Sequence, residues 1–444
     1  MITAKAFAGK SYAVLGLARS GAATVEALLA SGANVTAWDR QDVAREPFEG
    51  RCDLADPLEM DLTGFDGVVV SPGVPLNTHP IKPHAEKFGV PVIGDIELFA
   101  LARPELPPHK VVGITGTNGK STTTALVHHT LKTAGVPTTM GGNIGLPILA
   151  QDPLPENGVY VLELSSYQID LTFSLDCDVA VLLNITPDHL DRYDNYMAYA
   201  AAKLRLLGMQ SDEHLSFVGD ILPDGLVIDC DTNPIPKIDH SRQLNWPSLA
   251  GPHNAENASA AIQTCMELDL TPDEIEHGLR TFTGLPHRME LVTRHDGVLY
   301  INDSKATNPD STAPALAAYP PETSGKPRIH WIVGGLPKED GLGPCEQHLG
   351  NIAAAYTIGE AGPRFAELLE PHLHVERAEM LQDAVSRAKA SAREGDVILL
   401  SPACASFDQF RDYEARGAHF RQVVAALTGA SEEIQSALQA GDAE

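Results

Sequence analysis

Hydrophobic positions in this chain form short, nearly continuous runs that alternate with segments of helical periodicity. Such runs are typical of parallel strands buried on both faces, and the alternation predicts an α/β fold. The predicted strands are residues 11–17, 34–38, 67–70, 110–115, 159–163, 179–184, 298–302, 329–333, 353–358 and 397–400. The predicted helices are residues 20–31, 199–205, 254–268, 311–318, 381–392 and 417–427, together with a helix that Ser121 opens.

The length of 444 residues exceeds what one hydrophobic core usually spans, so we expect about three domains. A proline-rich linker at 103–108 closes the first domain, and a Gly-Leu-Pro turn before His287 precedes the third. The expected domains are therefore residues 1–103, 104–287 and 288–444, each built on an open α/β sheet.

The overall charge excludes two classes of partner. Lys and Arg number 32 against 59 Asp and Glu, which gives a net charge of −27, and no basic patch interrupts the acidic composition. Such a chain repels nucleic acids and anionic membranes, so an anionic small substrate must be held by local groups. The chain has no cationic leader and no apolar stretch long enough to cross a bilayer, which predicts a cytoplasmic protein without membrane insertion.

Cysteine spacing excludes two further kinds of site. The six cysteines are widely separated and form no Cys-x-x-Cys pair. We therefore expect reduced thiols, and neither a disulfide framework nor a zinc knuckle.

The segment 110–124 reads as a strand, a glycine-rich turn and the start of a helix, and it predicts a nucleotide-phosphate site. Gly116 and Gly119 allow backbone N–H groups to converge on phosphate oxygens, Lys120 adds a positive charge, and the Ser121 hydroxyl suits Mg²⁺. The generic P-loop pattern requires glycine where this chain has Ile114. The position of Gly-Lys-Ser between strand and helix still predicts that the protein uses ATP.

Acidic and histidine side chains follow two apolar strands downstream of this loop. Glu163 ends one strand, and its carboxylate could bind Mg²⁺ or cap the next helix. Asp188 and His189 follow another strand in a polar cluster, where a histidine could bind metal. The phosphate loop upstream favours the metal interpretation of both sites.

The first 40 residues begin like a dinucleotide-binding βαβ unit. Asp39 follows the second strand, where such folds place a ribose-binding acid. The turn, however, has Ala18 in place of the middle glycine, and its Cβ would crowd a pyrophosphate. A nicotinamide cofactor is therefore less favoured than another nucleotide held differently.

Other polar clusters allow both a functional and a local interpretation. Lys203 has the spacing of a solvated helical lysine. Asn254 and Asn257 could bind a purine edge or cap a helix. Arg288 could clamp phosphate and Asp303 could hold ribose, although turn chemistry explains such residues equally well.

The ordered motifs resemble those of the Mur ligases of peptidoglycan synthesis, from Val14 to Phe420. The matching motifs are Gly-Thr-Asn-Gly-Lys-Ser-Thr at 116–122, residues 184–193, Gly-Pro-His-Asn at 251–254, His287-Arg288 and residues 302–308. Three further motifs, at 164–168, 334–338 and 401–410, resemble the branch of the family that adds D-glutamate. This resemblance implies an N-terminal Rossmann-like domain, a central P-loop ATPase with a mostly parallel sheet and a C-terminal Rossmann-like domain.

The resemblance also implies roles for individual residues. For ATP they are Gly116, Thr117, Asn118, Gly119, Lys120, Ser121, Thr122, Asn257, Arg288 and Asp303. For Mg²⁺ they are Ser121, Glu163, His189 and Lys203, the last as a carbamate, and the catalytic set is Lys120, Glu163, His189 and Lys203. For the UDP-linked substrate they are Arg19, Ser20, Asp39, Ser71, Asn143, Ser165 and Gln168, and for D-glutamate Thr307, Lys338, Ser406 and Tyr413.

The implied reaction is an ATP-dependent amide ligation through an acyl phosphate. Its expected substrates are UDP-N-acetylmuramoyl-L-alanine and D-glutamate, its cofactors are ATP and Mg²⁺, and the expected oligomeric state is a monomer. The alternatives are a sibling Mur ligase, a folylpolyglutamate synthase that takes another amino acid, a nicotinamide oxidoreductase and a non-catalytic UDP-sugar-binding regulator.

Overall fold

The computed structural model describes residues 1–188, 192–246, 248–322, 324–338 and 341–429. The chain divides into two compact units. The first comprises Met1–Lys237 with Glu256–Gly278, and the second comprises Ile238–Ala255 with the chain from Leu279 onward. No helix within the described ranges combines the length and the apolar character that a bilayer crossing requires.

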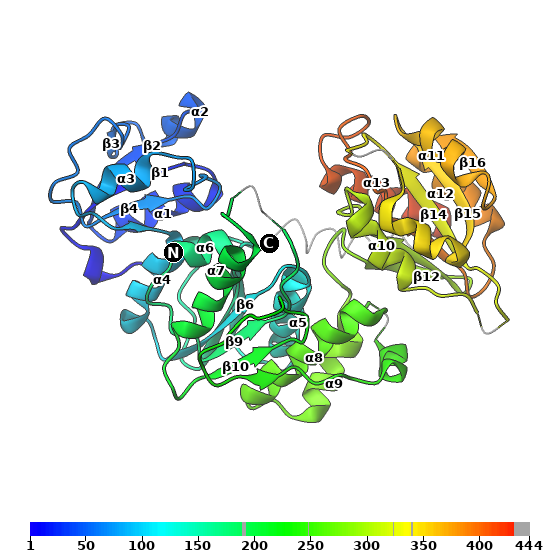
Figure 1. Cartoon of the computed structure of the whole chain (residues 1–444), viewed down its shortest axis with the longest axis horizontal. Coiled ribbons are helices and arrows are strands. Elements are labelled where there is room, and N and C mark those ends of the chain that lie inside the picture. Colours follow the sequence, from blue (N-terminus) through cyan, green and yellow to red (C-terminus); the bar gives the residue numbers. More distant parts are fainter. Residues whose placement is uncertain (189–191, 247, 323, 339–340, 430–444) are drawn as a thin grey trace. The chain divides into compact units, whose positions relative to one another are not determined.

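The first sheet is parallel throughout and has the strand order β3-β2-β1-β4-β5 (Figure 1). Its strands are β1 (Ser11–Leu15), β2 (Asn34–Trp38), β3 (Asp53–Leu54), β4 (Gly67–Val70) and β5 (Val92–Ile93). The accompanying helices are α1 (Arg19–Ala30), α2 (Asp42–Arg45), α3 (Ile81–Glu86) and α4 (Asp95–Ala102). The strands are parallel because the helices that connect them return the chain to the end of the sheet at which the preceding strand began.

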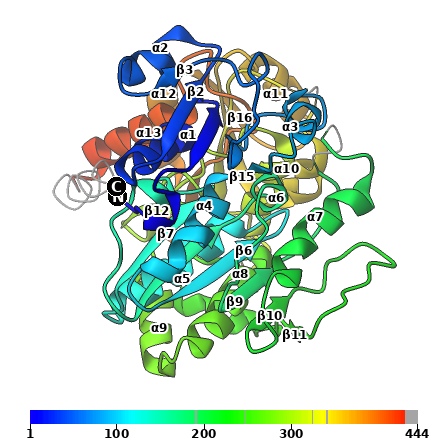
Figure 2. The same cartoon turned by 90° about the vertical axis from the view of Figure 1, so that its left-hand side faces the viewer.

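The second sheet is also parallel and has the order β11-β10-β9-β6-β8-β7. Its strands are β6 (His109–Thr115), β7 (Thr138–Gly142), β8 (Gly158–Glu163), β9 (Val179–Leu182), β10 (Leu215–Val218) and β11 (Asn233–Pro234). Its helices are α5 (Lys120–Thr133), α6 (Ser166–Asp170), α7 (Tyr196–Gly208), α8 (Pro252–Glu267) and α9 (Pro272–Thr281). Figure 2 shows α5 along β6, with which it is in contact, and β10 and β11 toward one edge of the sheet.

The third sheet has the order β12-β13-β17-β14-β15-β16. Its strands are β12 (Glu290–His295), β13 (Val298–Asn302), β14 (Ile329–Gly334), β15 (Ile352–Ile358), β16 (Val375–Glu379) and β17 (Val397–Leu400). Its helices are α10 (Pro309–Ala317), α11 (Gly362–Leu369), α12 (Leu381–Ser391) and α13 (Tyr413–Thr428). Only the β12–β13 pair is antiparallel among the described strand pairs of this sheet.

Buried side chains explain how each unit holds together. One continuous cluster in the first unit extends from Val14 on β1 through Phe99 on α4 to Tyr160 on β8, so its two sheets share a core. In the third sheet, neighbouring residues of one strand enter different cores: Trp331 belongs to one cluster and Ile332 to another. Both faces of that sheet are therefore covered, as expected for a parallel sheet.

The predicted α/β fold class is confirmed, and the long apolar runs are strands. Several elements were not predicted from the sequence, among them the strands β7, β12 and β16 and the helices α9 and α11. For two further kinds of element the physical reason is clear. The short strands β3, β5 and β11 have two residues each, which is too few to show a period. Helix α4 is buried along almost its whole length, so it lacks the polar face that marks an amphipathic helix.

Candidate active site

The predicted phosphate and metal residues of the first unit follow neighbouring parallel strands. Strands β9, β6, β8 and β7 are adjacent in that order. The glycine loop follows β6, Glu163 ends β8, Asn184 follows β9 and Asn143 follows β7. The carboxyl ends of parallel strands share one edge of a sheet, which is where open α/β sheets bind ligands.

The glycine loop is closely packed and requires its glycines. Gly116 has φ +153° and Gly119 has φ +86°, conformations that side chains disfavour. A Cβ on Gly119 would lie 2.1 Å from Asn257 Oδ1. Gly119 is the N-cap of α5, and its carbonyl accepts a hydrogen bond from Thr123 N–H. The N–H groups of the first helical turn therefore point toward the loop. The loop and helix start therefore form a site suited to phosphate.

Lys120 lies over this loop. Its Nζ donates hydrogen bonds to the carbonyl oxygens of Gly116 and Thr117, each at 2.9 Å. An ammonium at this position can exchange those carbonyls for phosphate oxygens, which carry a full charge and bind it more strongly.

Asn184 was named in the sequence only as the start of a motif, but it holds the glycine loop. Its side-chain Oδ1 accepts a hydrogen bond from Asn118 N–H at 2.9 Å, and its Nδ2 donates to Asn118 O at 3.2 Å. Its own carbonyl accepts from Thr117 N–H at 2.9 Å. An asparagine directly after an apolar strand was the only available signal, and the pairing depends on two strands that are adjacent in space.

Glu163 is a buried carboxylate whose two oxygens differ in their contacts. The residue is 1% exposed, its Oε1 accepts from Asn143 Nδ2 at 3.0 Å, and its Oε2 is buried without a hydrogen-bond partner among the described residues. A buried carboxylate oxygen without a donor is costly, and a hard cation would satisfy it. The capping alternative is wrong, because Ser165 is the N-cap of α6 and forms a capping box with Gln168.

Ser165 and Gln168 were predicted to bind the UDP-linked substrate. Their side chains contact each other and the α6 backbone in that capping box. This arrangement gives both residues a local role in fixing the turn that follows Glu163.

Lys203 is not the solvated residue that its spacing predicts. It is 1% exposed, and its Nζ donates to Gly116 O at 2.8 Å and lies 4.8 Å from the centre of the Tyr199 ring. Burial is the main cause, and the nearby Lys120 ammonium the second, of a pKa of Lys203 that is lowered to about 7. A neutral amine is therefore available near neutral pH, and a neutral amine is the form that reacts with carbon dioxide.

The structure says less about the remaining residues predicted to bind metal or phosphate. His189 lies outside the described residues. Ser121 and Thr122 are half-buried in the first turn of α5. Within the described ranges, no three His, Cys, Asp or Glu side chains gather in a way that could hold a metal ion. The candidate donor set therefore combines one carboxylate, Glu163, with a hydroxyl and Lys203.

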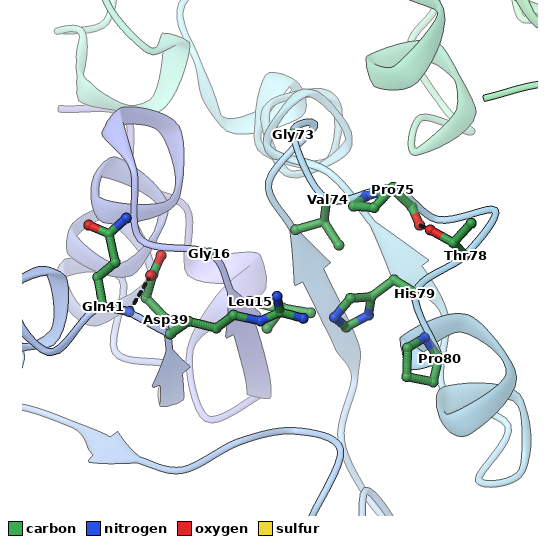
Figure 3. Close-up of a pocket in the computed structure, with 11 residues that line it drawn as sticks. Leu15, Gly16, Asp39, Gln41, Gly73, Val74, Pro75, Thr78, His79 and Pro80 are labelled. Carbon is green, nitrogen blue, oxygen red and sulfur yellow. Dashed lines mark hydrogen bonds between the residues drawn. The ribbon is translucent and has the colours of Figure 1, made fainter. Parts of the chain in front are cut away.

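A hollow of about 430 Å³ lies at the carboxyl edge of the first sheet (Figure 3). Figure 3 shows Asp39 and Gln41 on one side and Thr78 and His79 on the other, with Gly16 between the two groups. Asp39 Oδ1 accepts from Gln41 N–H at 2.9 Å, and its Oδ2 accepts from Leu17 N–H at 2.7 Å. The carboxylate thus fixes the β1–α1 turn where a ribose-binding acid was predicted.

The other residues predicted for the UDP-linked substrate lie around this turn. Ser71 Oγ donates to Gly16 O at 2.9 Å, and Ser20 and Ser71 line a second, narrow space beside Asp95. Arg19 Nη2 donates to Gly145 O at 2.9 Å. This bond connects the N-terminal turn to the loop after β7, which carries Asn143.

The predicted D-glutamate residues in the second unit follow three adjacent parallel strands, β13, β17 and β14. Lys338 Nζ donates to Thr307 Oγ1 at 3.1 Å. Leu336 and Ala405 exchange two backbone hydrogen bonds of 2.9 Å, which pair the loops that carry Lys338 and Ser406. Three of the four predicted residues therefore lie on neighbouring loops at one edge.

Tyr413 and Arg416 begin helix α13 beside these loops. The Lys305 ammonium lies 3.9 Å from the centre of the Tyr413 ring. Arg416, which the sequence analysis missed, is buried and donates to Ser304 Oγ and to the carbonyls of Ser304, Cys404 and Ala405. It joins the loops after β13 and β17, and no local pattern distinguished it from a surface arginine.

Arg288 and Asp303 also lie in the second unit. Arg288 is exposed, whereas Asp303 is buried. Asp303 Oδ2 accepts from Ser401 Oγ at 2.7 Å and its Oδ1 accepts from Met289 N–H at 3.1 Å. Burial raises the pKa of Asp303 to about 7. Asn257 lies in the first unit, where its Oδ1 is 3.3 Å from Thr123 Oγ1.

Comparisons with known proteins agree with this arrangement. Residues 114–221 match the Mur ligase middle domain, and residues 287–404 match the Mur ligase, glutamate ligase domain. A UDP-N-acetylmuramoylalanine--D-glutamate ligase of Novosphingobium aromaticivorans is 62% identical over 96% of this chain and 97% of its own length. The ligase of the same name from Sphingopyxis alaskensis is 58% identical over 96% of this chain and 100% of its own length.

Solved structures support the fold at much lower sequence identity. The UDP-N-acetylmuramate-alanine ligase of Thermotoga maritima has a TM-score of 0.54 at 17% identity, covering 94% of this chain and 99% of its own. The identity of the curated relatives over nearly their full length decides the classification. The chain belongs to the Mur ligase family, on the branch of the UDP-N-acetylmuramoylalanine--D-glutamate ligases.

Proposed function

We propose that this protein is a cytoplasmic, ATP-dependent ligase that joins D-glutamate to UDP-N-acetylmuramoyl-L-alanine during peptidoglycan precursor synthesis. The observation that carries the proposal is the 62% identity, over nearly the whole of both chains, to a ligase named for this reaction. The glycine loop, the buried Glu163 and the Lys338 cluster give the proposal a chemical basis at three places in the chain.

The reaction requires activation because an amine does not displace oxide from a carboxylate. In the proposed first step, the alanyl carboxylate attacks the γ-phosphorus of ATP, which forms an acyl phosphate and releases ADP. Lys120 and the N–H groups at the start of α5 bind the phosphate oxygens on which negative charge spreads. Asn184 keeps the loop in the conformation that these contacts need.

The residues present fit a divalent cation. Glu163 offers a buried oxygen that no donor of the described residues reaches, and Ser121 offers a hydroxyl at the start of α5. We assign Mg²⁺ to Ser121, Glu163, the carbamate of Lys203 and His189. When bound, Mg²⁺ supplies positive charge to the transferring phosphoryl group. Asn143 Nδ2 donates a hydrogen bond to Glu163 Oε1, so Oε2 is the oxygen that we assign to the cation.

We assign the UDP moiety and D-glutamate to residues that follow strands of different sheets. We assign the UDP moiety to Arg19, Ser20, Asp39 and Ser71 at the first sheet, with Asn143, Ser165 and Gln168 on the path to the glycine loop. The N-cap of α1 is Ala18, whose side chain forms no capping hydrogen bond, so the backbone N–H groups of the first turn can bind an anion. Asn257, Arg288 and Asp303 are assigned to the nucleotide.

D-Glutamate is assigned to Thr307, Lys338, Ser406 and Tyr413. Because the protein carries a net charge of −27, a substrate with two carboxylates needs a local cation, and Lys338 supplies one. In the second step the amine attacks the acyl carbon, the amine proton leaves to a nearby base, and phosphate departs.

An isotope-transfer experiment tests the proposed reaction. With ¹⁸O in the alanyl carboxylate of UDP-N-acetylmuramoyl-L-alanine, we expect one labelled oxygen to appear in the phosphate that is released when D-glutamate is added. Product formation should require D-glutamate in a panel that includes L-lysine, D-alanine, meso-diaminopimelate and L-glutamate. Unlabelled phosphate would contradict the acyl phosphate, and preference for another amino acid would favour a sibling ligase.

Replacing Lys338 with alanine should weaken amino-acid binding selectively. We expect KM for D-glutamate to rise about 10- to 100-fold because a charge-assisted hydrogen bond is lost. KM for ATP should stay within about twofold. Steady-state kinetics measure both values, and Arg364→Ala, which removes an exposed cation on α11 of the same unit, is the matched control. An unchanged KM for D-glutamate would remove Lys338 from the site.

A further inference from the structure

The backbone on either side of Arg288 is in a disfavoured conformation. His287 has φ +62° and Met289 has φ +45°, and neither is a glycine. Left-handed backbone is unfavourable for residues with a Cβ, and it persists only where surrounding contacts hold it. The exposed Arg288 therefore lies between two residues that the fold must hold in place.

Two carboxylates provide those contacts, one on each side. Glu290 Oε2 accepts from His287 N–H at 2.8 Å, and Asp303 Oδ1 accepts from Met289 N–H at 3.1 Å. The His287 carbonyl also accepts from Lys305 N–H at 2.9 Å. The turn is thus bound to β12 and to the loop after β13.

Glu290 is the centre of a larger network. Its Oε2 also accepts from Asn302 Nδ2 at 2.9 Å and from Arg421 Nη2 at 3.1 Å, and Arg421 Nε lies 2.8 Å from Oε1. Glu290 is opposite Asn302 in the β12–β13 register. The Arg421 side chain is only 9% exposed, so α13 contributes a nearly buried charge to this carboxylate.

The network leaves little freedom for the side chain of His287. Asn302 Nδ2 lies 3.0 Å from His287 Nδ1, and a Cβ on Gly417 of α13 would lie 2.0 Å from that same ring nitrogen. Glycine is therefore required where α13 passes the turn. The ring and the backbone N–H of His287 are both fixed by groups that also contact α13.

An ordinary structural ion pair would attach α13 to β12 without a strained turn. Here the same carboxylate oxygen that binds Arg421 also binds the N–H of a residue with positive φ, next to an exposed arginine. Because the strained turn has Arg288 at its centre, the contacts determine where the backbone of Arg288 lies and the direction in which its side chain leaves the chain.

We propose that Glu290 and Arg421 are positioning residues that hold Arg288 in the orientation that binds the phosphates of ATP. This inference rests on the proposed function of Arg288. Neither residue touches the nucleotide; the ion pair acts through the His287 N–H and through Asn302.

A double-mutant cycle tests the inference with the full-length enzyme. Glu290→Gln leaves the Arg421 charge without its partner, and we expect it to raise KM for ATP about tenfold while KM for D-glutamate changes less than about twofold. Arg288→Ala should raise KM for ATP by at least as much. In the Arg288→Ala background, Glu290→Gln should add little, because the side chain that it positions is absent.

Two controls make the outcomes distinguishable. Glu370→Gln breaks an exposed ion pair with Arg377 in the same unit and should leave KM for ATP unchanged. If Glu290→Gln is not recovered folded, Arg421→Lys, which keeps the charge, should raise KM for ATP by a smaller factor, again only when Arg288 is present. Equal, additive effects in both backgrounds, or equal loss for all substrates, would show a merely structural pair and overturn the inference. If Arg288→Ala leaves KM for ATP unchanged, the proposed function of Arg288 fails instead.

Discussion

Replacing Lys120 with alanine is expected to lower kcat by about three orders of magnitude. The reason is electrostatic: the ammonium lies at the glycine loop, and its charge is needed most when negative charge spreads over the transferring phosphoryl group. Quenched-flow or steady-state phosphate release measures the loss. The protein should stay folded, because Lys120 Nζ donates hydrogen bonds to carbonyls of the glycine loop itself, at the start of its own helix.

The matched control for this variant is on the same helix. Lys132→Ala removes an exposed cation from the last turn of α5 and should leave kcat unchanged. Isothermal titration should find normal binding of UDP-N-acetylmuramoyl-L-alanine to the Lys120→Ala protein. Loss of both turnover and substrate binding would indicate misfolding, and retained turnover would exclude the assigned role.

Replacing Lys203 with alanine should remove most activity, on the order of 100-fold. The proposed carbamate is a metal-binding carboxylate, so added acetate or formate should restore part of kcat in a concentration-dependent manner. Lys120→Ala is the control, because small carboxylates cannot replace a cation. Absence of rescue at every concentration would argue against the carbamate.

The lowered pKa of Lys203 gives this prediction a pH dependence. Burial disfavours the ammonium, so the neutral amine is populated near pH 7 and falls as the pH decreases below that value. Enzyme stripped of carbon dioxide should therefore regain activity faster at pH 8 than at pH 6 when bicarbonate is added. Nuclear magnetic resonance with ¹³C-bicarbonate should detect the carbamate carbon in the native protein and not in Lys203→Ala.

Local sequence determined the position of the phosphate loop. A run of apolar residues, two glycines and a Lys-Ser pair can form only a few structures, and the observed β6, loop and α5 follow the predicted order closely. The same reasoning placed Glu163 and the Lys338 segment after strands. Because the strands are parallel, these residues necessarily lie at carboxyl edges.

Tertiary structure decided what local patterns left open. The insertion of β17 between β13 and β14 places the loops of Thr307, Ser406 and Lys338 side by side, and strand order does not follow from the order of strands in the chain. The capping box at Ser165 excluded the capping role of Glu163. Lys203 has the spacing of a surface lysine, yet it is buried against the glycine loop.

Local sequence was therefore sufficient to predict the α/β class, the phosphate loop and the kinds of side chain available for chemistry, because these depend on contacts between near neighbours in the chain. Long-range packing established that Glu163 Oε2 has no donor in the part of the chain that the structure describes, that Asn184 holds the glycine loop and that Glu290 joins α13 to the turn of Arg288. Burial and hydrogen-bond partners depend on residues far apart in sequence, and the packing of whole sheets and helices brings those residues together.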